Sequence, residues 1–318
     1  MGTISKTQSI IAVTIVNCFA IFFAGVYALP LFFYEEKPVS KPEPLIAAPP
    51  RPDPFTEISL QAEAAYVIDT ATGKVLFAKN EEAQLPLASV TKVMTALVAS
   101  SLPSEMAVQV TESDVASGNG GLSVGEEWNL KNLLDYTLVV SSNSGASAIA
   151  GAAGAVMANQ EGDESARNED VFVREMNRTA KNLGMTQTFY LNPSGLDENE
   201  ELSGAYGSAK DMAILFNHIL KTDPLLLEST AYDSLSFKSQ NGVSHRAVNT
   251  NIIARSVPGL MASKTGYTLL ANGNLVIVFN AGMMKPIIVA VLDSTQEGRF
   301  SDVEKLVNAS LQKIGQGK

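Results

Sequence analysis

The chain has 318 residues, which is enough for one membrane segment and one good-sized folded domain. Its net charge of -10 at pH 7 argues against nucleic acid or an anionic membrane surface as the main partner. Cys18 is the only cysteine, so disulfides within the chain and thiol catalysis are excluded. We assign no catalytic role to His218 or His245. No group of Cys, His or acidic residues has metal-ligand spacing, so we expect neither a metal nor a cofactor.

The N-terminal part of the sequence predicts a membrane anchor. Residues 9–34 contain no charged residue, and this run of 26 residues exceeds the roughly 20 needed to cross a bilayer. We favour an uncleaved signal anchor after a short tail, residues 1–8, because no convincing cleavage site is present; a cleaved signal peptide is the alternative. Residues 35–56 hold seven prolines and predict an extended, semi-rigid linker. The folded domain is expected over residues 57–318.

The predicted elements of this domain are strands first, helices in the middle and strands last. This order favours an α+β fold, in which one antiparallel sheet packs with a helical region. Residues 146–159 are rich in Ala and Gly and can pack closely against neighbours, whereas residues 161–170 and 241–246 are expected to be loops. The expected strands are 64–69 and 74–78 (a hairpin), 107–110, 274–279 and 286–292, and the expected helices start near Ser89 and cover 130–140, 171–183, 208–220 and 301–314.

Ser89 and Lys92 form a Ser-x-x-Lys tetrad at the start of an apolar run with helical spacing. Residues three apart on a helix lie on the same face, and a neutral lysine amine there can take the proton of a serine hydroxyl. The field of a helix N-terminus also favours the neutral amine. On the tetrad alone, a helix N-cap followed by an exposed lysine is the commoner explanation. A second Ser-x-x-Lys, residues 310–313, is interpreted as the solvated end of the last helix.

Two more short motifs follow in order. Ser141-Ser142-Asn143 comes after the apolar segment 130–140, and Lys264-Thr265-Gly266 opens a strand pattern. A Ser-x-x-Lys, a Ser-x-Asn and a Lys-Thr-Gly element in this order are typical of β-lactamases and penicillin-binding proteins. Residues 121–125 match the Gly-x-Ser-x-Gly nucleophile motif, but no strand precedes them, so we place no nucleophile there.

With these motifs the chain resembles the serine D-alanyl-D-alanine carboxypeptidases, the low-molecular-mass penicillin-binding proteins, over about residues 58–311. Residues 192–197 are similar to the family's Asn-x-x-Gly-Leu-Asp element, for which we prefer the role of a structural turn. The resemblance implies a fold like that of the β-lactamases. One departure is Ser144, because the family commonly has Asp after the Asn of the middle motif, and this puts the local support of that loop in question.

The resemblance implies acyl transfer at a peptide that ends in D-Ala-D-Ala. Ser89 would attack the penultimate carbonyl and form an acyl-enzyme, with Lys92 as its base. Ser141 would pass the proton to the departing D-Ala, and Asn143 would bond the substrate backbone or Lys92. The remaining implied contacts are Lys264, Thr265 and Arg299 for the substrate carboxylate, Gly266 for a closely approaching substrate strand, and the backbone amides of Ser89 and Tyr267 as oxyanion hole.

The resemblance also implies partners and a location. The substrates would be peptidoglycan stem peptides, β-lactams would be covalent inhibitors, and the domain would lie outside the cytoplasmic membrane on its single N-terminal helix. A D,D-endopeptidase or a β-lactamase with the same site is one alternative. A class A β-lactamase needs a glutamate for its deacylating water, and we find no convincing counterpart, although Glu161, Glu164 and Glu169 lie in a loop that could conceal one. A catalytically silent, membrane-tethered binding module is the other alternative, although the intact motifs speak against it.

Overall fold

The structure is a computed structural model that describes residues 52–118, 120–162, 165 and 167–316. The predicted tail, membrane segment and most of the linker lie outside the described residues. The chain divides into two units, residues 1–50 and 51–318, and the account below concerns the second. In the described ranges, no helix combines the length and the apolar character that crossing a bilayer requires.

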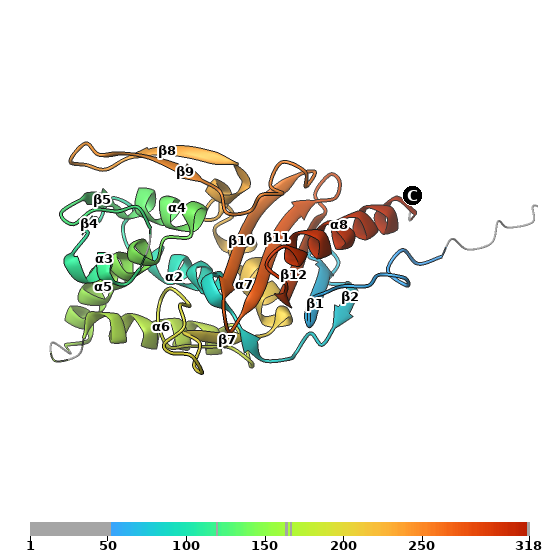
Figure 1. Ribbon diagram of the computed structural model, residues 1–318, viewed down its shortest axis with the longest axis horizontal. Coiled ribbons are helices and arrows are strands. Elements are labelled where there is room, and N and C mark those ends of the chain that lie inside the picture. Colours follow the sequence, from blue (N-terminus) through green and yellow to red (C-terminus); the bar gives the residue numbers. More distant parts are fainter. Residues whose placement is uncertain (1–51, 119, 163–164, 166, 317–318) are drawn as a thin grey trace, which may run out of the picture. The chain divides into compact units, whose positions relative to one another are not determined.

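The centre of this unit is a five-stranded sheet with the strand order β10-β11-β12-β1-β2 (Figure 1). Every neighbouring pair in it is antiparallel, so the predicted antiparallel sheet is confirmed. The first strands of the domain lie beside the last ones, because β1 pairs with β12. The strands are β1 (Ala64–Asp69), β2 (Val75–Lys79), β10 (Leu260–Thr268), β11 (Asn272–Asn280) and β12 (Pro286–Ser294).

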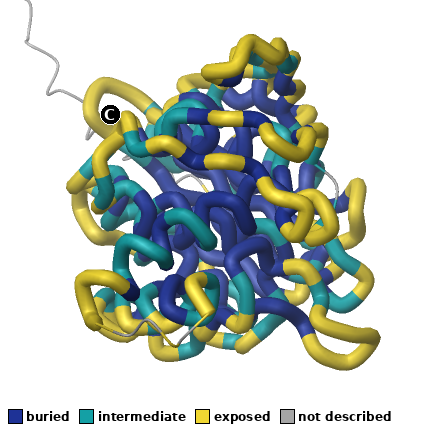
Figure 2. Tube along the Cα trace, turned by 90° about the vertical axis from the view of Figure 1, so that its left-hand side faces the viewer, coloured by how far each residue is buried: buried dark blue, intermediate teal, exposed yellow. Residues whose placement is uncertain are grey.

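Both faces of the sheet are covered, as expected for strands that are apolar on both sides. Side chains alternate between the faces of a strand. In β11, Leu275 and Ile277 therefore pack in one cluster with residues of α8 (Gly298–Gln316), while Val276 joins the larger cluster with the other helices. Figure 2 shows the buried segments gathered inside a shell of exposed loops.

Most of the helices lie at the β10 side of the sheet (Figure 1), whereas α7 (Ala209–Thr222) packs against β12 and β1. In α5, a Cβ at Gly154 would stand 1.8 Å from the carbonyl oxygen of Asn168, so the glycine lets the start of α6 approach closely. This close approach explains why residues 146–159 are rich in Ala and Gly. The helices are η1 (Ala88–Thr91), α2 (Lys92–Ala99), α3 (Glu112–Ala116), α4 (Leu130–Val140), α5 (Asn143–Glu161), α6 (Asn168–Asn182), α7 (Ala209–Thr222) and η2 (Glu228–Ala231).

Small sheets complete the region. They are β3 (Leu85–Pro86), β7 (Ala205–Gly207) and β6 (Phe189–Tyr190); β4 (Ala107–Gln109) and β5 (Glu127–Asn129); and the hairpin β8 (Ser234–Lys238) and β9 (Ser244–Val248). The predicted loop over 241–246 is therefore wrong in part, because residues 244–246 belong to β9. The hairpin was missed because its strands alternate between exposed and partly buried positions with few apolar side chains.

Three further expectations need correction. The predicted surface loop over 161–170 is shorter, since α5 continues to Glu161 and α6 begins at Asn168. Ser310 is not solvated: it is buried, and its hydroxyl donates to the carbonyl of Leu306 at 2.7 Å. Lys264 does not open its strand, because β10 already begins at Leu260.

Candidate active site

Ser89 lies in the η1 turn, and Lys92 is the first residue of α2. The Ser89 Oγ and Lys92 Nζ atoms are 2.8 Å apart. The residue before the serine, Ala88, has a φ of 47°, a left-handed conformation that residues with a Cβ adopt at a cost. Such strain is held by the packing around it. A Cβ at Gly195 would stand 1.9 Å from the carbonyl oxygen of Ala88, so this glycine lets a second loop lie against the turn.

Lys92 is 1% exposed, and its Nζ atom has two further neighbours. Asn143 Oδ1 lies at 2.7 Å and the carbonyl oxygen of Ser194 at 2.8 Å. Burial, and secondly the charge of Lys264, lower the pKa of Lys92 well below its usual value. A neutral amine has two N–H groups and one lone pair. Because both neighbours can only accept, they take the two N–H groups and leave the lone pair for the proton of Ser89.

A second buried lysine stands beside the serine of the middle motif. Ser141 ends α4 with a left-handed φ of 62°. Lys264 Nζ donates to Ser141 Oγ at 2.8 Å and to the carbonyl of Thr265 at 2.9 Å. Burial, and then the neighbouring charge of Arg299, lower the pKa of Lys264 to about 7. Ser141 is therefore connected to a group that gains or loses a proton near neutral pH.

Strand β10 packs directly on the turn that carries Ser89. A Cβ at Gly266 would stand 2.8 Å from the carbonyl oxygen of Leu87 and 3.2 Å from the backbone nitrogen of Ser89. Thr265 is fixed by a 2.6 Å hydrogen bond to the Thr250 hydroxyl. Arg299 is buried, not on the surface, and its Nη1 donates to the carbonyl of Gly266 at 2.7 Å.

These groups surround one cleft with a volume of about 610 Å³. The structure brings all nine candidate residues to it, since Lys92 and Lys264 lie just behind the serines to which they bond. Glu161 and Glu169 do not line it, and Glu164 lies outside the described residues. In the described ranges, no group of three His, Cys or acidic residues could hold a metal ion. The lining residues are Ser89, Gly120, Gly121, Tyr136, Val140, Ser141, Asn143, Thr250, Thr265, Gly266, Tyr267, Gln296 and Arg299.

Comparison with known proteins decides the family. A family model described as D-alanyl-D-alanine carboxypeptidase, peptidase S11, matches residues 49–296. This chain belongs to that family. A curated relative named D-alanyl-D-alanine carboxypeptidase DacF, from Bacillus subtilis, is 32% identical over 261 residues, which are 80% of this chain and 63% of DacF. A relative named D-alanyl-D-alanine endopeptidase, from Pseudomonas aeruginosa, is 28% identical over 80% of each chain. The chain thus spans less than two thirds of DacF.

Solved structures agree with this family and with its fold. A D-alanyl-D-alanine carboxypeptidase from Mycobacterium tuberculosis matches with a TM-score of 0.70 and 26% identity, over 83% of this chain and 95% of that one. Penicillin-binding protein D2 from Listeria monocytogenes, in an ampicillin-bound form, matches with a TM-score of 0.64 and 26% identity, over 79% and 98%. The expected resemblance to penicillin-binding proteins is therefore confirmed.

The family's Asn-x-x-Gly-Leu-Asp element does more here than form a turn. Its Ser194 carbonyl accepts from Lys92, and its Pro193 carbonyl accepts from the Thr95 hydroxyl at 2.6 Å. Asp197 accepts from the Thr268 hydroxyl at 2.9 Å, which connects the element to the end of β10. The prediction of a purely structural turn was therefore too narrow, because the element also contacts Lys92. The match to the family motif was the signal in the sequence for such a contribution to the site.

The departure at Ser144 is accommodated locally. Ser144 is buried, with its Oγ 3.2 Å from Ser142 Oγ. Ser142 also caps α5 by accepting from the backbone N–H of Gly145 at 2.9 Å. Asn143, the first residue of α5, is therefore held in place without an Asp after it.

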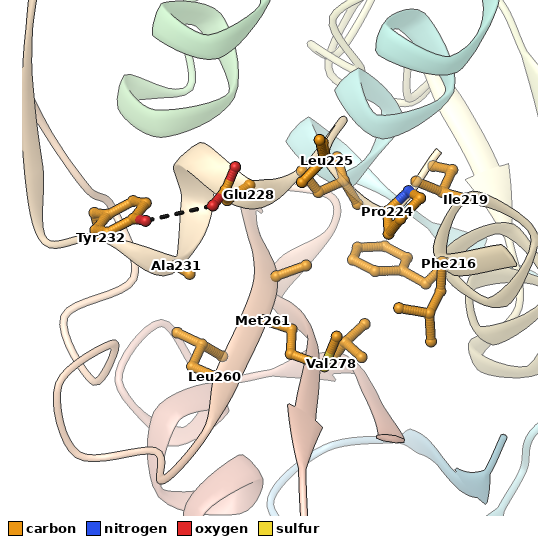
Figure 3. Close-up of a pocket in the computed structure, with 13 residues that line it drawn as sticks. Phe216, Ile219, Pro224, Leu225, Glu228, Ala231, Tyr232, Leu260, Met261 and Val278 are labelled. Carbon is orange, nitrogen blue, oxygen red and sulfur yellow. Dashed lines mark hydrogen bonds between the residues drawn. The ribbon is translucent and has the colours of Figure 1, made fainter. Parts of the chain in front are cut away.

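A second pocket, of about 400 Å³, lies between α7, η2 and the first part of β10 (Figure 3). Its walls are mostly apolar and include Phe216, Met261 and Val278. Tyr232 and Glu228, on its rim, make a 3.5 Å contact. None of the nine candidate residues lines it, so it carries no part of the chemistry argued below.

Proposed function

We propose that this protein is a serine-type D-Ala-D-Ala carboxypeptidase, which removes the terminal D-Ala from peptidoglycan stem peptides through an acyl-enzyme on Ser89. The observation that carries the proposal is the surrounding of Lys92. Lys92 is a buried amine with a lowered pKa, it lies 2.8 Å from the Ser89 hydroxyl, and two acceptors hold it in place. Such an amine can activate the serine as a nucleophile.

The first step forms a bond between Ser89 Oγ and the penultimate carbonyl carbon, while the Ser89 proton moves to Lys92. The backbone N–H groups of Ser89 and Tyr267 stabilise the negative charge that develops on the carbonyl oxygen. The C–N bond to D-Ala then breaks, and the proton that Lys92 took from Ser89 passes to the departing amine through Ser141, which bonds to Lys264. Lys92 is then neutral again and takes a proton from the water that attacks the ester. The bond to Ser89 Oγ breaks, this proton returns to Ser89, and the shortened peptide leaves with a new carboxyl end.

The substrate carboxylate would be held at the end of the cleft that Lys264, Thr265 and Arg299 form. A guanidinium carries five N–H donors, and one of those of Arg299 bonds to Gly266, so donors remain for the substrate. Cations on this side also fit the carboxylate of a penicillin. The ampicillin-bound relative supports β-lactams as inhibitors of this protein.

A D,D-endopeptidase is the second candidate. It would use the same groups on the D-Ala carbonyl of a cross-link, and a relative over 80% of the chain carries that name. The two activities differ in the leaving group, which is free D-Ala for one and a second peptide for the other.

The proposed place of action is the outer side of the cytoplasmic membrane. Support comes from the uncharged residues 9–34 and the proline-rich linker, residues 35–56, because D-Ala-D-Ala termini occur in peptidoglycan outside that membrane. Protease accessibility of the domain in intact spheroplasts would test this location, and protection of the domain would contradict it.

The decisive experiment labels the full chain, in detergent, with a fluorescent penicillin and maps the adduct by mass spectrometry. We expect a stable acyl group on Ser89, none in Ser89→Ala, and release of D-Ala from a pentapeptide by the wild type. Ser236→Ala is the matched control, because Ser236 is exposed on β8 and should label like the wild type. Release of a peptide from a cross-linked dimer would favour the endopeptidase. Rapid penicillin turnover would point to a β-lactamase, and neither adduct nor turnover would contradict the mechanism.

A further inference from the structure

One wall of the catalytic cleft has no role in the mechanism above. It is the loop of residues 120–125, between α3 and β5, which we call the wall loop. Its residues Gly120 and Gly121 line the cleft together with Tyr136 of α4. The wall loop belongs to the helical region, whereas Thr265 to Tyr267 on β10 belong to the sheet. A peptide bound along β10 therefore has the wall loop as a neighbour.

The wall loop lies directly on α4 and the start of α5. The Tyr136 hydroxyl donates to the carbonyl of Gly120 at 2.7 Å. A Cβ at Gly120 would stand 1.9 Å from Ser142 Oγ, and a Cβ at Gly121 would stand 2.8 Å from the Tyr136 hydroxyl. The two glycines thus allow a contact that any side chain would push away from the cleft.

A buried pair fixes the other end of the same loop. Glu126 accepts from the backbone N–H of Ser123 at 2.7 Å with one carboxylate oxygen. Its second oxygen accepts from Trp128 Nε1 at 3.1 Å and lies 2.7 Å from His245 Nε2. Both Glu126 and His245 have side chains less than a tenth exposed. Asn241, at the tip of the β8–β9 hairpin, donates to the Gly125 carbonyl at 2.8 Å.

His245 and two other aromatic side chains surround the ring of Tyr136. The Tyr136 ring centroid lies 5.3 Å from that of His245, 5.4 Å from that of Trp128 and 6.0 Å from that of Phe237. His245 and Phe237 come from the β8–β9 hairpin, which lies over α4 (Figure 1). The hairpin thus places aromatic rings around Tyr136 and a partner on Glu126, and both effects act on the wall loop.

We propose that Tyr136 and His245 are positioning residues that set the wall loop for the part of the substrate beyond its D-Ala-D-Ala end, and so determine affinity for the peptide stem. This inference rests on the proposed function. It assigns to His245 a role that has no part in proton transfer. A β-lactam nucleus without an acyl side chain reaches only the groups around Ser89 and Lys264, so it should be insensitive to the wall loop.

The first test is Tyr136→Phe, which removes the hydroxyl and keeps the ring. We expect the KM for a pentapeptide to rise about fivefold, as the loss of one hydrogen bond implies, with kcat within about twofold of wild type. Acylation by 6-aminopenicillanic acid, the penicillin nucleus without a side chain, should stay within about twofold. Tyr232→Phe is the matched control, since it removes a hydroxyl on the rim of the second pocket and should change neither quantity.

The second test separates positioning from general packing. His245→Phe keeps an aromatic ring but removes the contact of His245 with Glu126, so the KM should rise as in Tyr136→Phe. His245→Gln retains an N–H donor and should restore the KM toward the wild-type value. An unchanged KM in Tyr136→Phe would overturn the inference, as would a parallel loss of kcat and of acylation by the penicillin nucleus. A wild type that neither releases D-Ala nor reacts with penicillin would instead contradict the proposed function.

Discussion

Lys92 and Lys264 are both buried, yet they lie beside different serines, and we expect them to have different roles. Lys92 has two acceptors and one serine around its Nζ atom, an arrangement that suits a neutral amine. Lys264 has a pKa of about 7, so its ammonium form is available below neutral pH, where it can donate to Ser141 and attract a carboxylate. Burial makes both lysines easier to deprotonate, because the interior disfavours the charged form.

The pH dependence of acylation tests this division of roles. A protonated Lys92 cannot take the proton of Ser89, so the rate should rise as pH increases through the lowered pKa of Lys92. Lys264→Gln removes a cation that disfavours protonated Lys92, so the pKa of Lys92 should increase and the acid limb of the rate profile should move to higher pH.

The measurement is the rate of reaction with a fluorescent penicillin across pH 4 to 10, at about 25 °C. The maximal rate of Lys264→Gln should fall by roughly 10²-fold, because Ser141 loses its partner. Lys210→Gln removes a surface lysine that pairs with Glu82 and serves as the control. An acid limb that Lys264→Gln leaves in place would show that Lys264 does not influence Lys92.

At the scale of elements, the site depends on the contact between η1 and β10. In the proposed mechanism, the nucleophile Ser89 lies on a short turn, and the oxyanion hole requires the backbone N–H groups of Ser89 and Tyr267 to face the same point. Gly266 allows the close approach of β10 to the η1 turn, because it has no Cβ. Asn274 of β11 reinforces the contact, since its Nδ2 donates to the carbonyls of Pro86 and Leu87 at 2.9 and 3.0 Å.

We predict that Gly266→Ala separates these elements. Its Cβ would meet backbone atoms that cannot move without shifting Ser89, so acylation should fall at least about tenfold. The free energy of unfolding should fall by about 1–3 kcal/mol, as in other overpacked interiors. Gly151→Ala in α5 is the control, because nothing lies within 4 Å of its Cβ and the helix should be unchanged or stabilised by about 0.5–1 kcal/mol. Wild-type acylation by Gly266→Ala would refute the argument.

At the scale of the whole domain, segments near both ends of the described chain are joined by hydrogen bonds. Asp302 of α8 is fully buried, and its carboxylate accepts from the backbone N–H groups of Gln61 and Ala62 at 3.1 and 2.9 Å. It also accepts from the Ser294 hydroxyl of β12 at 2.9 Å. This single carboxylate connects the entry to β1, the end of β12 and the last helix.

Asp302→Ala should therefore destabilise the domain as a unit. Two buried backbone N–H groups would lose their acceptor, at about 1–3 kcal/mol each, so we expect a loss of roughly 3 kcal/mol in the free energy of unfolding. Urea denaturation followed by circular dichroism measures this quantity. Asn308→Ala, on the exposed side of the same helix, should stay within about 0.5 kcal/mol. Equal midpoints for the two variants would contradict the prediction.

The sequence by itself determined the elements whose signal is local. Short runs rich in apolar and β-branched residues predicted β1, β2, β11 and β12, and helical spacing predicted most of the helices, because each pattern follows from the geometry of a single element. Three ordered motifs were enough to propose Ser89, Lys92 and Ser141 and to indicate the family. The β8–β9 hairpin was not predicted, because its exposed strands have few apolar side chains in alternation.

Only the tertiary structure decided which groups touch. Ser141 and Lys264 are 123 positions apart, and Lys92 and the Ser194 carbonyl are 102 apart, so no local pattern contains these contacts. They arise because β10 lies on the η1 turn and because Gly195 lets its loop lie against Ala88. The environment of His245 is decided in the same way, by a hairpin that packs over a helix. Burial of the two lysines, and with it their lowered pKa, follows from this packing, and no residue pattern encodes it alone.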